Sequence, residues 1–250
     1  MSVGTLPPHK GSVAAAKTPL SAWLKPALTS TIGSKFLVAI TGMMLVGFLC
    51  GHLAGNLLIF KGQDAINAYA KGLKDLGGLL WVARIGLLVA FVMHVTVAVR
   101  LQLRNRSARP ERYQYPGTVQ ASTASLTMLY SGLLILAFVF YHLAHYTFGG
   151  VHNADDGRNL LELHDSLGRH DVHRMVIIGF SKWWVSLSYV IAQLVLWFHL
   201  SHGISSIFQT LGLNAPKYWP IIRGAGLLLA TIIVVGNISI PLAVLLGWVH

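Results

Sequence analysis

Five long apolar stretches constrain this chain more than any other feature of its sequence. A helix that crosses about 30 Å of hydrocarbon needs roughly 20 apolar residues, and five segments reach that length. They are 36–60, 79–99, 124–148, 183–211 and 224–248. Of the 250 residues, 54% are hydrophobic and only 11% are charged, which excludes a water-soluble globule of ordinary composition. We therefore expect an all-α integral membrane protein with five transmembrane helices.

Little of the chain remains outside these spans. We expect residues 1–35 to form a cytoplasmic N-terminal segment and residues 36–250 to form one transmembrane domain. A large soluble active site would then have to lie on a partner chain. The single cysteine, Cys50, excludes an internal disulfide and a Cys-x-x-Cys-His haem attachment. The first 35 residues have no apolar signal and no arginine, which favours a bacterial cytoplasmic segment, with a disordered cap as the alternative.

The distribution of charge predicts the orientation in the membrane. With the N-terminus inside, the inner segments hold eleven basic residues and one acidic residue, whereas the outer loops hold eight basic and seven acidic residues. The cluster that begins at Arg100 and ends at Arg112 lies directly beside a span, as the positive-inside rule expects for a cytoplasmic loop. Next to a membrane, such a cluster suits lipid head groups or a docked protein better than nucleic acid.

Six histidines fall within the first four spans. They are His52, His94, His142, His145, His199 and His202. A polar side chain in hydrocarbon is costly, so each of them needs a partner or a function. Four successive helices that each supply a histidine suggest a cofactor gripped from facing helices, because bundle cofactors are held in that way. We expect the first four helices to form a haem-binding bundle.

Depth in the membrane sorts these histidines into two pairs. Counted from the inner face at about 1.5 Å per residue, His52 and His142 lie at similar height in the outer half. Counted from the outer face, His94 and His199 lie level in the inner half. Two nitrogens that face each other across the bundle would fill both axial positions of one haem iron.

His145 and His202 are the rival ligands, each one helical turn beyond the member that depth favours. The alternative interpretations are that they contact haem propionates or quinone, or that they form hydrogen bonds within the bundle. Near His52, Gly47, Gly51 and Gly55 recur every fourth residue, a pattern that lets a helix or a flat macrocycle approach closely. The fifth span has no internal histidine, so we expect it to pack outside the haem bundle.

The longest loop, about 149–182, lies outside in this topology. It contains four histidines, His152, His164, His170 and His173. Their spacing matches no zinc pattern, so we interpret the loop as a solvated cover over the outer haem, with a metal site as the alternative. Within it, residues 172–180 are expected to form a short interfacial segment that leads to Trp183 and Trp184.

The sequence around these histidines resembles the di-haem cytochrome b membrane-anchor subunit of succinate:quinone oxidoreductases, the succinate dehydrogenases and fumarate reductases. The resemblance covers most of the chain. Four segments carry it: Thr41-Gly42 followed by Gly-His-Leu-Ala-Gly-Asn at His52, Phe-Val-Met-His at His94, Phe-Val-Phe-Tyr-His at His142, and His-Leu-Ser-His-Gly at His199. It implies His52, His94, His142 and His199 as axial ligands of two haems b, paired as the depth estimate pairs them.

The resemblance also implies partners and a function. A flavoprotein subunit would carry the succinate chemistry, an iron-sulfur subunit would pass electrons, and this chain would relay them to quinone, most often menaquinone in this type. The complex would lie in a bacterial cytoplasmic membrane. Besides the ligands, the residues expected near propionates or quinone are Ser34, Lys35, Gly51, Arg100, His145, Lys182, Trp183 and His202. The polar and aromatic members of this set equally suit anchors at the membrane interface.

Two other hypotheses fit parts of the pattern. A proton-coupled transporter with a histidine relay would be colourless, although the sequence has no evident inverted repeat. A stand-alone transmembrane haem oxidoreductase would have the same haem spectrum but would purify alone. Co-purification with a flavin and iron-sulfur chain would distinguish this last hypothesis from the membrane-anchor subunit.

Overall fold

The computed structural model describes residues 30–108, 122–154 and 157–250. Within these residues five helical segments are long and apolar enough to cross a membrane, as the sequence predicted. They are α2 (Thr31–Asn56) with the 3₁₀ turn η1 (Leu57–Lys61), α4 (Gly78–Ser107), α6 (Met128–His142) with the π-helical turn η2 (Leu143–Thr147), α8 (Trp183–Thr210) and α9 (Trp219–Leu245). The N-terminal segment up to residue 29, and Arg109 and Arg112 of the basic cluster, lie outside the described residues.

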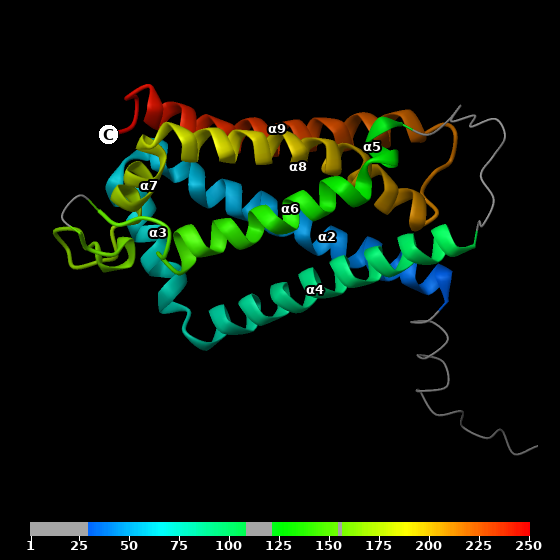
Figure 1. Cartoon of the computed structure of the whole chain (residues 1–250), viewed down its shortest axis with the longest axis horizontal. Coiled ribbons are helices and arrows are strands. Elements are labelled where there is room, and N and C mark those ends of the chain that lie inside the picture. Colours follow the sequence, from blue (N-terminus) through cyan, green and yellow to red (C-terminus); the bar gives the residue numbers. More distant parts are fainter. Residues whose placement is uncertain (1–29, 109–121, 155–156) are drawn as a thin grey trace, which may run out of the picture.

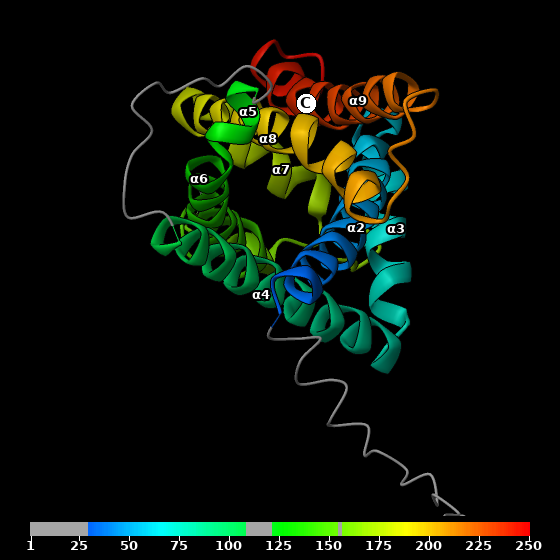
Figure 2. The ribbon, with the colours of Figure 1, turned by 90° about the vertical axis from the view of Figure 1, so that its right-hand side faces the viewer.

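The first four spans form a ring, and the fifth lies beside it. The bundle runs lengthwise in Figure 1, and Figure 2 looks along it to show α2, α4, α6 and α8 around a common centre. Helix α2 packs against α4 and α8, and α6 packs against α8. Helix α9 packs along α8 and also contacts α2, outside the ring, as its lack of an internal histidine predicted.

The outer surface of the bundle is apolar. Side chains such as Leu88, Phe140 and Ile221 are more than half exposed along the spans, which is the pattern of helices that face lipid. Trp81, Trp183 and Trp248 are also exposed, and all three lie near the same end of the bundle, where α4 and α8 begin and α9 ends. Tryptophan is enriched at membrane interfaces. We call this the outer end, and the end where α2 begins the inner end.

A cover of short elements closes the outer end, at the left of Figure 1. It consists of α3 (Gln63–Asp75), the turns around η3 (Leu160–Glu162), and α7 (Val172–Ser181), which the sequence predicted at residues 172–180. Helix α3 was not predicted. Gly62 and Gly77, on either side of α3, have φ of 96° and 53°, values that favour glycine and let the chain turn sharply at both ends of the helix.

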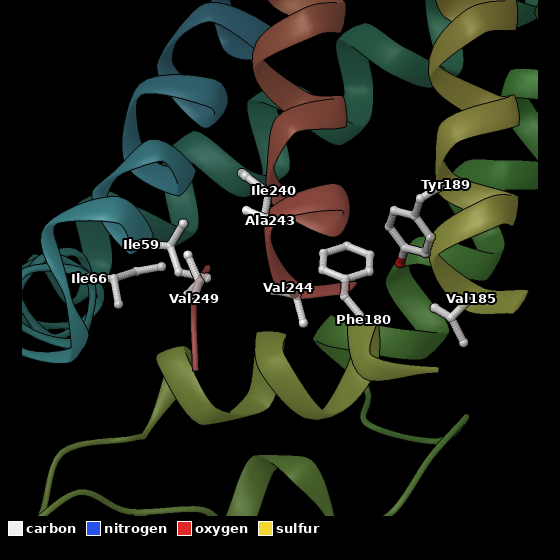
Figure 3. Close-up of a cluster of buried hydrophobic side chains, with 9 residues drawn as sticks. All are labelled: Ile59, Ile66, Phe180, Val185, Tyr189, Ile240, Ala243, Val244 and Val249. Carbon is white, nitrogen blue, oxygen red and sulfur yellow. The ribbon is translucent and has the colours of Figure 1, made fainter. Parts of the chain in front are cut away.

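The largest cluster of buried apolar side chains in the described residues lies where this cover meets the spans. Figure 3 shows nine buried side chains that converge there from the end of α2, from α3, α7, α8 and the end of α9. They are Ile59, Ile66, Phe180, Val185, Tyr189, Ile240, Ala243, Val244 and Val249. Burial of this apolar surface fixes the outer ends of the helices, and the phenol of Tyr189 points from this core toward the histidines of α6.

Candidate haem-binding site

His52 of α2 and His142 of α6 face each other near the outer end of the ring. Their ring centres lie 5.9 Å apart and the ring planes are perpendicular. The imidazole of His52 also stacks on Phe48, one turn earlier on α2, with 5.3 Å between ring centres. The similar depth of His52 and His142 in the membrane, estimated from the sequence, predicted that they lie close together. The structure brings the two side chains together from helices that are far apart along the chain.

Tyr189 of α8 links His142 to the rival histidine, His145. Its phenol oxygen lies 3.3 Å from Nδ1 of His142 and 3.1 Å from Nδ1 of His145. The backbone changes to a π-helical turn directly after His142, so His145 is not placed one regular α-helical turn further along. Instead, its fully buried ring stacks on Tyr146 and meets the edge of His152 in the outer cover.

Several buried polar atoms gather around His145. Nε2 of His145, Nε2 of His152 and the hydroxyl of Tyr146 make no hydrogen bond within the described part of the chain. A Cβ at Gly179 of α7 would clash with both the His145 ring and the Tyr146 hydroxyl, so only glycine fits there. Buried polar groups of this kind are normally satisfied by a bound water or ligand. Sequence reasoning did not identify Gly179 as part of this cluster.

His94 of α4 and His199 of α8 form the second pair, nearer the inner end. The two imidazoles are close enough to interact electrostatically. A hydroxyl from a neighbouring helix meets each ring: Thr41 Oγ1 of α2 lies 3.2 Å from Nδ1 of His94, and Ser131 Oγ of α6 lies 3.1 Å from Nδ1 of His199. Both contacts use Nδ1, so Nε2 of each ring is left for another partner.

His202, the other rival, is turned toward its own helix. Its Nε2 lies 2.9 Å from the hydroxyl of Ser206, one turn further along α8. The electrostatic neighbour of its ring is Arg223, near the start of α9. His199, and not His202, is therefore the α8 histidine whose ring meets a hydroxyl of a neighbouring span.

The remaining sequence-predicted residues lie at the two ends of the bundle. At the inner end, Ser34 is buried at the start of α2, while Lys35 beside it and Arg100 on α4 are exposed. At the outer end, Lys182 directly precedes α8 and interacts electrostatically with His145 and His152. Burial and this ammonium group lower the pKa of His152, which is therefore neutral at pH 7.

Trp183 and the glycines of α2 complete the set. The side chain of Trp183 is 67% exposed, as an interface anchor would be. Of the three glycines, only Gly55 lies against another part of the chain, because a Cβ there would overlap Tyr69 of α3. Gly47 and Gly51, which both precede His52, have open space at the Cβ position. The glycine pattern therefore serves close helix packing at one of its three positions.

The histidines of the outer loop do not gather around one point. His152 packs on Trp184 and His145, His164 and His170 pair their backbones in an isolated bridge, and His173 is buried beneath the cover. In the described ranges, no three histidine, cysteine or acidic side chains come together in a metal-binding group.

Comparison with known proteins gives no relative from which to assign the site. No protein-family model, curated protein or solved structure matches the chain.

Proposed function

We propose that this chain is a membrane-embedded cytochrome b that holds two haems b, each between two histidines. The proposal rests chiefly on the contact between His52 and His142, and on His94 and His199, which meet hydroxyls of neighbouring spans at a second depth. One buried histidine would be explained by a local hydrogen bond. Histidines from four successive spans, at two depths in an apolar bundle, suit bis-histidine haem ligation.

The residues present fit this cofactor. An imidazole nitrogen lies about 2 Å from a metal that it binds, so two rings on opposite sides of one ion have centres about 6 Å apart. The ring centres of His52 and His142 are 5.9 Å apart. Gly47 and Gly51, which precede His52 by five residues and by one, have no neighbouring atom within 4 Å of their Cβ positions. At the inner pair, the hydroxyls bind Nδ1 and leave Nε2 for the metal.

A haem with both axial positions filled transfers single electrons and has no open site for oxygen. We propose that this chain is the membrane anchor of a succinate:quinone oxidoreductase, with an iron-sulfur subunit as electron partner and a flavoprotein as the site of succinate chemistry. The four histidine segments that resemble that family support this assignment.

The same proposal gives the location and the electron acceptor. The chain would lie in a bacterial cytoplasmic membrane with its N-terminus inside, where the basic cluster that begins at Arg100 would face the soluble subunits and lipid head groups. Quinone, most simply menaquinone, would exchange electrons with the haems. Lys182 and Trp183 at the outer end, and Ser34, Lys35 and Arg100 at the inner end, are the candidates for contacts with propionates or quinone.

A reduced-minus-oxidised spectrum of the purified chain, with haem quantification, tests the proposal. Two haems b per chain are expected, and a flavin and iron-sulfur chain should co-purify under mild solubilisation. A colourless protein would contradict the proposal and favour the histidine-relay transporter. Two haems without soluble partners would favour the stand-alone oxidoreductase, and one haem per chain would contradict the two-pair arrangement.

A further inference from the structure

Both inner histidines rest on the same dipeptide, a hydroxyl residue followed by glycine. On α2, Thr41 binds Nδ1 of His94, and a Cβ on Gly42 would lie 3.2 Å from Cε1 of the same ring. On α6, Ser131 binds Nδ1 of His199, and a Cβ on Gly132 would lie 3.5 Å from Cε1 of that ring. In each case the hydroxyl holds the imidazole while the glycine lets it lie close against the neighbouring helix.

The hydroxyl hydrogens define the direction of these bonds. Thr41 Oγ1 lies 2.6 Å from the carbonyl oxygen of Leu37, and Ser131 Oγ lies 3.1 Å from that of Met128. A hydroxyl has a single hydrogen. We assign that hydrogen to the backbone carbonyl in both residues, so that the hydroxyl oxygen accepts the hydrogen of the imidazole Nδ1. We assign both rings as the tautomer with hydrogen on Nδ1 and a free electron pair on Nε2, the form that binds a metal.

The two dipeptides lie at equivalent places in two helical hairpins, α2 with α4 and α6 with α8. Thr41 precedes His52 by eleven residues on α2, and Ser131 precedes His142 by eleven residues on α6. Eleven residues are about three helical turns, so each hydroxyl shares a helix face with the outer histidine about 16 Å away. The second helix of each hairpin, α4 or α8, brings the inner histidine to the dipeptide. Each proposed haem therefore takes one ligand from each hairpin.

We propose that Thr41 and Ser131 are matched positioning residues that fix the orientation and the tautomer of the inner axial ligands and so set the potential of the inner haem. This inference rests on the proposed haem-binding function. A hydroxyl that accepts the Nδ1 hydrogen makes the imidazole more electron-donating, which favours ferric over ferrous iron. Removal of either hydroxyl should raise the midpoint potential of the inner haem.

The test uses the full-length, haem-loaded complex in six variants. Thr41→Val and Ser131→Ala remove the hydroxyls, whereas Thr41→Ser and Ser131→Thr retain them. Thr96→Val on α4 and Ser239→Ala on α9 are matched controls, because their hydroxyls bond only carbonyls of their own helices in the described contacts, at 2.7 Å in each case. The readouts are haem content, the midpoint potential of each haem, and the low-spin electron paramagnetic resonance spectrum, which reports ligand orientation.

We expect Thr41→Val and Ser131→Ala each to raise the midpoint potential of the inner haem by about 59 mV. For one electron this corresponds to a roughly tenfold change in the ferric-to-ferrous equilibrium. The midpoint potential of the outer haem should be unchanged in all variants. The hydroxyl-retaining variants and the controls should leave both potentials unchanged. Loss of the inner haem from Thr41→Val with retention in Thr41→Ser would also support the role of the hydroxyl.

Three results would overturn the inference. If the chain carries two haems but the midpoint potential of the inner haem is unchanged in both hydroxyl-free variants, this inference fails and the proposed function stands. The same holds if Thr41→Ser and Ser131→Thr change the inner haem as much as the hydroxyl-free variants do. A wild-type chain without haem would instead overturn the proposed function together with the inference.

Discussion

The phenol oxygen of Tyr189 lies 3.3 Å from Nδ1 of His142. A phenol has one hydrogen, so it can donate to only one of its two imidazole neighbours. If Nε2 of His142 binds iron, Nδ1 of His142 must carry the hydrogen and donate it to Tyr189, which then donates to His145. This order leaves a hydrogen on Nε2 of His145, so the same network that prepares His142 as a ligand makes His145 unsuitable as one.

Tyr189→Phe should disturb the outer haem and spare the inner one. The change removes the acceptor for His142 and leaves polar atoms of two buried rings without a partner. Loss of such a supporting hydrogen bond typically weakens metal binding roughly 10- to 100-fold, so we expect partial loss of the outer haem and a raised midpoint potential in what remains. Redox titration with haem quantification measures both effects. Tyr130→Phe, on a 61% exposed tyrosine of α6, is the control, and equal effects of the two changes would contradict this role.

Alanine substitutions separate the ligands from their neighbours. His94→Ala or His199→Ala should remove the inner haem and leave most of the outer haem, and His52→Ala or His142→Ala should do the reverse, because each haem keeps its own pair of ligands. His145→Ala and His202→Ala should retain two haems per chain. Haem stoichiometry and the reduced spectrum measure these outcomes. Retention of both haems in any of the first four variants would show that the assigned ligand is wrong.

Apolar length predicted the five spans, but not their ends. Helix α2 begins five residues earlier than expected, because Ser30 caps it by accepting a hydrogen bond from the backbone N–H of Gly33 at 3.0 Å and so extends the helix through a more polar turn. Helix α4 continues to Ser107 through the arginines beside the span. Helix α3 was missed because it is short and largely polar, with only Ile66 and Asn67 fully buried. Its stability depends on the loop that packs over it, which hydropathy does not reveal.

The sequence likewise predicted some features of the candidate site and not others. Residue counts along single helices predicted that His52 and His142 would meet, because depth depends only on local rise. The contacts of Thr41 with His94 and of Ser131 with His199 join residues 53 and 68 positions apart, and which helices are neighbours was not evident from the sequence. The π-helical turn that redirects His145 is also a tertiary feature, since its residues have no distinctive composition.

Asn67 should be the most sensitive residue of the outer cover. Its buried side chain donates to Asp165 and Asp171 at 3.2 and 3.0 Å and accepts from the backbone N–H of His173 at 3.1 Å. Asn67→Leu would leave buried polar groups without partners, so the free energy of unfolding should fall by about 3 kcal/mol. Thermal unfolding in detergent measures the change.

The control for Asn67 lies on the same helix. Lys71→Ala breaks an exposed ion pair with Asp75 and should cost less than about 1 kcal/mol. If the two substitutions cost the same, the buried network would not be what holds α3 to the rest of the cover.

The pH dependence of the cover should depend on Asp165. Burial opposes ionisation of its 3% exposed side chain, but hydrogen bonds from the backbone and guanidinium of Arg169, from Asn67 and from the backbone of Leu167 outweigh that cost and lower its pKa to about 2. An unfolded aspartic acid has a pKa of about 3.9. The stabilisation is therefore complete above about pH 4 and is lost as the pH falls through about 2.

Asp165→Asn removes this contribution at every pH. The difference in unfolding temperature between the wild type and Asp165→Asn should therefore be constant from about pH 7 to about pH 5, and should shrink as the pH falls below about 4. Asp64→Asn is the matched control, since Asp64 bonds the same arginine at 2.9 Å but is 84% exposed. Its effect should be small and should weaken with salt. A difference for Asp165→Asn that stays constant down to about pH 2 would show that the charge of Asp165 does not stabilise the cover.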